Sequence, residues 1–96
     1  PDQTLVSMTN GGSEDWYSIS LISYHRRGGR RGFFKAMNFI ARSMAILFNA
    51  RPHWGKHIPL GQEVTSLYPN WPTYQEVARE LDPRQQFCNS WFMSLK

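Results

Sequence analysis

Residues 51 to 57 read RPHWGKH, and this short run holds the side chains best suited to chemistry. Pro52 and Gly55 within it and Pro59 just after it keep it from forming a regular helix. Lys56 is therefore a cation on a constrained loop, where it can stabilise negative charge that develops on a substrate or on a cofactor ring. Trp54 would supply a flat apolar wall beside it. Packing of Trp54 and His53 next to a solvated Lys56 explains the same residues equally well from spacing alone.

His53 and His57 are four residues apart, which on a helix would place two imidazoles on one face as a metal-binding pair. Gly55 and the flanking prolines disfavour that helix, and no third ligand is close in the sequence. Cys88 is the single cysteine, which rules out an internal disulfide and a cysteine zinc cluster. The sequence therefore predicts no metal site.

Residues 25 to 31 read HRRGGRR, the densest basic run in the chain. Clustered arginines can neutralise the phosphates of a nucleic acid or contact an acidic protein surface. No aromatic residues alternate with these arginines for base stacking, so a solvated loop is the favoured interpretation. The alternative function is a non-catalytic interaction module that docks this basic loop on an acidic partner or on nucleic acid.

The 96 residues include four tryptophans, six phenylalanines and four tyrosines, whereas only 19% are charged. A core of this size is marginal on its own, so we expect the aromatic surface to pack against a larger protein. The sequence shows no secretion signal and no long apolar run, which predicts no membrane span. A single cysteine fits a reducing, intracellular location.

Two periodicities follow one another in the first half of the chain. From Trp16 to His25 apolar and polar residues alternate, which predicts a strand. From Phe33 to Phe48 apolar residues recur every three or four positions, which predicts a helix. That helix should end near Asn49, because Arg51 precedes a proline. A strand followed by helices predicts an α+β fold.

The second half predicts irregular backbone and then short helices. Residues 62 to 68 favour a turn of helix, and a longer helix should begin at a cap on Asn70, with Pro72 in its first turn. Asp82 can cap a further turn that starts at Pro83. Four apolar side chains should anchor the end of the chain: Phe87, Trp91, Phe92 and Leu95.

Three motifs in the second half resemble the carboxyl-terminal region of FAD-linked sugar-lactone and polyol oxidases. They are RPHWGKH at 51 to 57, LYPNW at 67 to 71 and LDPRQQFCNSW at 81 to 91, in the order seen in the family. This group, similar to D-arabinono-1,4-lactone oxidase, L-gulonolactone oxidase and alditol oxidase, belongs to the vanillyl-alcohol-oxidase superfamily. Its members carry a His-Trp-x-Lys motif beside the flavin ring.

The resemblance implies an enzyme whose FAD accepts hydride from a hydroxyl-bearing carbon of a sugar lactone, a polyol or a similar alcohol. It implies that Lys56 is catalytic, because its charge would stabilise the reduced ring, and that His53, Trp54 and Lys56 contact the cofactor. His57 and Arg51 would belong to the substrate pocket. The strand and helices would form part of an antiparallel substrate (cap) domain, with a helical carboxyl-terminal half.

Two departures from the family pattern bear on what the chain can do. Asn49 and Ala50 stand where a pair of glycines is common, and Gln85 replaces a frequent glycine. The FAD-binding domain and the family's Glu-x-Arg pair are not found in these residues. We therefore expect residues 1 to 96 to be one segment, the carboxyl-terminal part of a larger FAD-dependent oxidoreductase. Alone it should be inactive, and the FAD-binding portion should complete it as a cleaved chain or a separate subunit.

Overall fold

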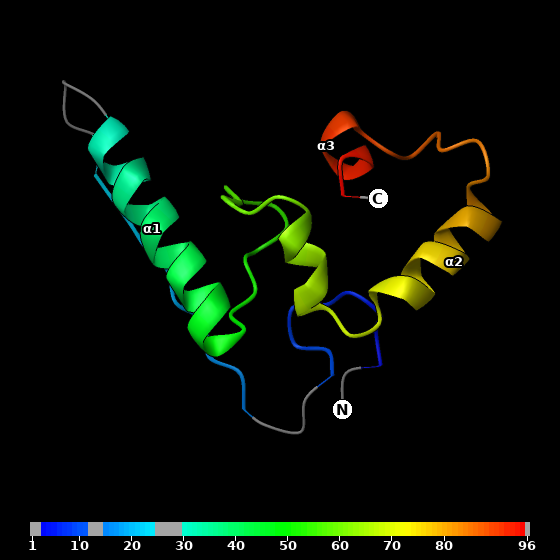
Figure 1. Cartoon of the computed structure of the whole chain (residues 1–96), viewed down its shortest axis with the longest axis horizontal. Helices are drawn as coiled ribbons and strands as arrows, with labels where there is room; N and C mark the ends of the chain where they lie inside the picture. Colours follow the sequence, from blue (N-terminus) through cyan, green and yellow to red (C-terminus); the bar gives the residue numbers. More distant parts are fainter. Residues whose placement is uncertain (1–2, 12–14, 25–29, 96) are drawn as a thin grey trace.

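The computed structural model describes residues 3–11, 15–24 and 30–95, and their path is shown in Figure 1. The described residues form α1 (Arg31–Phe48), the 3-10 helix η1 (Gln62–Leu67), α2 (Trp71–Leu81) and α3 (Ser90–Met93). α1 lies along one edge of the molecule, η1 near the middle, and α2 and α3 toward the opposite edge (Figure 1). His25 and the arginines at 26 and 27 of the predicted basic loop lie outside the described residues.

The predicted α+β fold is wrong, because residues 3–11, 15–24 and 30–95 contain no strand. Residues 15–24 have no regular secondary structure and run beside α1 (Figure 1). Their alternation describes a chain whose side chains point to opposite sides, but a strand also needs a hydrogen-bonded neighbour. No other segment in the described part of the chain provides that neighbour. The predicted antiparallel cap-domain strand is therefore replaced by irregular backbone.

The first predicted helix is confirmed, and α1 begins at Arg31, two residues before the predicted Phe33. It ends at Phe48, close to the expected position, and the cap residue Asn49 has a φ of 52°, which lies in the left-handed region. The backbone N–H of the next residue, Ala50, donates to the carbonyl of Met44 over 3.2 Å, which closes the last turn. A glycine is the usual residue for this conformation, and asparagine is the next best tolerated.

The second helix, α2, begins at Trp71 with Pro72 in its first turn, as predicted. The predicted side-chain cap does not form, because the Asn70 side chain makes no capping hydrogen bond. Its amide nitrogen donates instead to Oδ1 of Asn10 over 3.0 Å. Asn70 thus connects the start of α2 to the amino-terminal segment. The two asparagines are 60 residues apart, so no local sequence pattern predicts this contact.

Asp82 organises the turns between α2 and α3. Its carboxylate accepts hydrogen bonds from the backbone N–H groups of Gln86 at 2.8 Å and Phe87 at 2.9 Å. This confirms the predicted turn after Asp82. Gln85 within it has a φ of 55°, a left-handed conformation that glycine adopts more easily.

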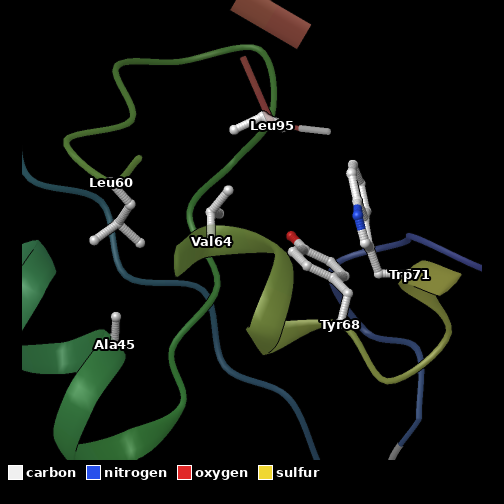
Figure 2. Packing of buried hydrophobic residues seen from close by; sticks show 6 residues of the cluster. All are labelled: Ala45, Leu60, Val64, Tyr68, Trp71 and Leu95. Atoms are coloured by element: carbon white, nitrogen blue, oxygen red, sulfur yellow. The ribbon is translucent and has the colours of Figure 1, made fainter. Parts of the chain in front are cut away.

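The core is small and lies between α1, η1, α2 and the carboxyl terminus. Its buried residues are Ala45, Leu60, Val64, Tyr68, Trp71 and Leu95 (Figure 2). Leu95 is therefore a confirmed anchor, and Phe92 packs against this core. Phe87 is 91% exposed, so its predicted anchoring role is wrong within this chain. Its backbone is held by Asp82, and that contact leaves the ring in solvent.

No helix among the described residues is both long enough and apolar enough to cross a bilayer.

Candidate functional site

The run RPHWGKH lies on irregular backbone between α1 and η1, as the sequence predicted. A tight turn shapes its centre, because the backbone N–H of Lys56 donates to the carbonyl of His53 over 3.0 Å. The backbone N–H of Gly55 donates to Nδ1 of His53 over 2.9 Å. A side chain at Gly55 would press on the His53 ring, whose Cε1 lies 3.3 Å from an ideal Cβ. Glycine therefore leaves room for the imidazole to fold back over the turn.

Trp54 anchors this loop in the aromatic part of the core. Its ring stacks on Tyr68, with centroids 4.9 Å apart, and lies 6.3 Å from the ring of Trp71. Trp91 meets it edge to face at 6.1 Å. The indole N–H donates to the backbone carbonyl of Val6 over 2.9 Å. Trp54 thus holds the loop in place, the packing role that spacing alone had left open.

Arg51 joins three separate segments through its guanidinium group. Nε donates to the carbonyl of Leu67 over 2.8 Å, and Nη1 donates to the carbonyls of Met8 at 3.2 Å and Asn10 at 2.5 Å. The group also lies 4.7 Å from the ring centre of Trp16 and 4.8 Å from that of Tyr68. Burial lowers the pKa of Arg51, although guanidinium remains charged at any physiological pH.

The two histidines of the motif have complementary hydrogen-bonding states. Nδ1 of His53 accepts from the Gly55 N–H, so a neutral His53 carries its proton on Nε2. Nε2 of His57 lies 2.8 Å from Oδ1 of Asn38 on α1, where it acts as the donor. A neutral His57 therefore keeps Nδ1 as an acceptor. The ring of Phe34 meets the His57 ring edge to face at 5.1 Å and fixes its plane.

A cavity of about 480 Å³ brings together His53, Lys56 and His57. Its remaining walls come from residues 18–22, from α1 between Phe33 and Ala41, and from Pro52 and Pro59. The wall residues other than the three motif side chains are Ser18, Ile19, Ser20, Leu21, Ile22, Phe33, Phe34, Met37, Ala41, Pro52 and Pro59. The cavity is therefore mainly apolar, with nitrogen-bearing side chains from one loop.

Lys56 is exposed and faces two hollows. Besides the cavity of residues 18–22 and α1, it lines a second hollow of about 270 Å³ with Trp54, His57 and Trp91. Within the described residues, no carboxylate pairs with its ammonium group. The positive charge of Lys56 is thus available to a negatively charged group in either hollow.

The structure does not group all the predicted site residues. Arg51 and Trp54 do not line the large cavity, and their polar groups are occupied by backbone carbonyls. Asn38 and Phe34 were not among the predicted site residues, although they orient His57. Only contact with a loop about twenty residues later reveals their role, so no local pattern in the sequence marks them.

Among residues 3–11, 15–24 and 30–95, no three His, Cys, Asp or Glu side chains gather as metal ligands. The hollows combine one cation with aromatic and apolar walls that can contact a flat apolar ring. Lys56 can face such a ring with its charge, and the aromatic and proline side chains can contact its surface.

Comparison with known proteins assigns this chain to a family of oxidases. The chain belongs to the D-arabinono-1,4-lactone oxidase family, whose model matches residues 1–95. This confirms the resemblance seen in the three motifs. A long-chain alcohol oxidase from an uncultured marine euryarchaeote is 50% identical over 96 residues, which are 99% of this chain and 20% of the relative. The chain thus spans about a fifth of that relative's length. No solved structure matches the chain.

Proposed function

We propose that this chain supplies the HWGK loop to the active site of an FAD-dependent oxidoreductase that acts on a hydroxyl-bearing carbon. The family and the archaeal relative support an oxidase. The observation that carries the proposal is the position of Lys56, unpaired among the described residues and lining hollows walled by apolar and aromatic side chains. The FAD-binding portion of the same enzyme is the proposed partner, because the chain spans a fifth of its relative.

Each motif residue has a distinct part in the proposed reaction. When bound, the flavin supplies the acceptor for the substrate's hydride. Lys56 stabilises the negative charge that this transfer creates. His53 offers an N–H donor from Nε2, which can hold the substrate oxygen, and His57 offers Nδ1 as an acceptor for the hydroxyl proton. Trp54 and Arg51 keep the loop in position.

The walls of the large cavity support one substrate class over another. A sugar lactone or polyol carries several hydroxyl groups, each of which needs a hydrogen-bonding partner when buried. Apart from the three motif side chains, the cavity offers only Ser18 and Ser20 as polar side chains. Its aliphatic and aromatic walls favour an alcohol with an alkyl chain. The name of the archaeal relative, a long-chain alcohol oxidase, agrees with this choice.

The test uses a chimera in which residues 1–96 replace the matching fifth of the archaeal relative. The chimera should bind flavin, seen as a yellow absorption spectrum, and oxidise 1-octanol faster than D-arabinono-1,4-lactone. Lys56→Ala should lower kcat by about 100-fold, the usual loss when one charge-stabilising group is removed. Arg79→Ala, which removes an exposed cation in the last turn of α2, outside the three family motifs, is the matched control.

Flavin content and thermal unfolding should be unchanged in the Lys56→Ala chimera, since Lys56 is exposed. Unchanged turnover in that variant would remove Lys56 from the mechanism. Faster oxidation of the lactone than of 1-octanol would overturn the substrate class while leaving the oxidase assignment intact.

A further inference from the structure

α1 carries a second apolar stripe that the described residues of its own chain leave uncovered. Phe39, Ile46 and Leu47 are 73%, 80% and 70% exposed. The opposite side of the helix faces the chain, where Asn38 bonds His57 and Ala45 enters the core. α1 lies along the edge of the molecule in Figure 1, with η1, α2 and α3 all to one side. Large apolar side chains gathered on one exposed face mark a contact surface.

The spacing on this face is that of a helix-packing seam. Ala36, Phe39, Ser43 and Ile46 follow one another at intervals of three, four and three residues, the a and d positions of a heptad. Small residues alternate with large ones, so a second helix can approach closely between the larger side chains. We call Ala36, Phe39, Ser43, Ile46 and Leu47 the outer face of α1.

Charge distinguishes between the possible occupants of the outer face. α1 has three basic residues, Arg31, Lys35 and Arg42, and its sequence contains no aspartate or glutamate. Lys35 and Arg42 flank this seam, so two copies of α1 packed together would bring four cations into one interface, with Glu63 at 3.9 Å from Arg42 as the nearby carboxylate of each copy, which disfavours a second copy of this chain. A helix with an apolar stripe and an acidic edge would complement both the outer face and its cations.

We infer that the outer face of α1 docks an apolar helix with an acidic edge, provided by the FAD-binding portion of the same enzyme. This inference rests on the proposed function, because that function requires the remaining four-fifths of the relative's length. Docking on α1 also bears on the site. α1 carries Asn38 and Phe34, so a helix packed on its outer face would fix the wall that orients His57.

Cysteine labelling of the full-length chimera tests this inference without relying on activity. Ala36→Cys places a thiol on the outer face, and Thr73→Cys places one on the exposed side of α2 as a matched control. Each variant also carries Cys88→Ser. The rate of maleimide labelling at each introduced cysteine is measured by peptide mass spectrometry in buffer and in urea. We expect at least tenfold slower labelling of position 36 in buffer, and little protection at position 73.

Equal labelling of positions 36 and 73 in a folded, flavin-containing chimera would overturn the docking but not the proposed function. Protection at position 36 that disappears on dilution, together with a dimeric mass, would assign the face to a second copy and overturn the inference. Protection in a monomeric chimera that lacks flavin and activity would support docking while removing the proposed function. Phe39→Glu should raise the labelling rate at position 36, whereas Leu81→Glu on α2 should not.

Discussion

The indole N–H of Trp54 donates to the backbone carbonyl of Val6 over 2.9 Å, which connects the HWGK turn to a segment 48 residues earlier. The same indole ring stacks on Tyr68 of the core. One side chain therefore couples the loop, the amino-terminal segment and the core. Lys56 lies two residues further along the chain, so its position depends on this anchor.

Replacing Trp54 with phenylalanine should separate the hydrogen bond from the stacking. The smaller ring can still stack on Tyr68, but the carbonyl of Val6 loses its donor. We expect the free energy of unfolding to fall by about 1 to 3 kcal/mol, the range for an unmet buried polar group. Urea unfolding followed by circular dichroism measures it. Trp91→Phe, which removes an indole with an edge-on ring contact, should cost less, and an equal cost would argue against the Val6 bond.

Arg51→Lys tests whether the forked shape of the guanidinium matters as well as its charge. Arg51 reaches the carbonyls of Leu67 and Asn10 from different nitrogens, a geometry that a lysine ammonium cannot reproduce. We expect a loss of about 2 kcal/mol in the free energy of unfolding, typical for hydrogen bonds from a charged group.

The matched control for this substitution is Arg42→Lys. Arg42 lies 3.9 Å from Glu63 in an exposed pair, where the loss should stay below about 1 kcal/mol. Thermal unfolding of both variants gives the comparison. A larger effect at Arg42 would contradict the structural role assigned to Arg51.

The local features of the fold could be predicted from the sequence, but its long-range contacts could not. Helical periodicity and turn residues placed α1, the irregular loop and the start of α2 within a few residues. The strand prediction failed because the alternation describes a single segment, whereas a strand needs a second segment to form hydrogen bonds with. For the same reason the sequence shows none of the carbonyl partners of Arg51, which lie on distant segments.

For the candidate site too, the sequence identified the residues of one motif but not the residues that contact it from distant segments. The motif identified Lys56, His53 and His57, which line one cavity. Asn38 and Phe34 of α1 contact His57. They could not be predicted, because the pattern of α1 indicates only which side of the helix is apolar. Asn49 and Gln85 gave a clearer signal, because both stand where glycines were expected and both adopt a left-handed backbone.

Gln85→Gly should therefore stabilise the chain. The φ of Gln85 is 55°, a conformation that strains a residue with a β-carbon, and glycine removes that strain. We expect a gain of about 0.5 to 1 kcal/mol in the free energy of unfolding, partly offset by the greater freedom of glycine in the unfolded chain. Asn49→Gly should give a smaller gain, since asparagine tolerates this region better. Thermal unfolding measures both, and destabilisation by Gln85→Gly would show that its side chain makes a contact worth more than the strain.

Tyr68→Phe should raise stability at neutral pH and lessen its decline in alkali. Tyr68 is 2% exposed, and its hydroxyl has no hydrogen-bonding partner among the described residues. Removing an unpaired buried hydroxyl should leave stability unchanged or raise it by about 1 kcal/mol. The phenylalanine ring keeps the contacts with Trp54 and with the Arg51 guanidinium.

The alkaline effect follows from the pKa of the same hydroxyl. Burial raises the pKa of Tyr68 above its ordinary value of 10.0. As pH rises past that ordinary value the unfolded chain loses its proton first, so the folded state loses stability until the pH reaches the raised pKa. The pKa of Tyr74 is also raised, mainly by burial. Part of the alkaline decline in stability should therefore remain in Tyr68→Phe. Urea unfolding between about pH 8 and pH 11 should show a shallower fall for Tyr68→Phe than for the parent chain. Parallel curves for the two would mean that Tyr68 ionises as readily in the folded chain as in the unfolded one.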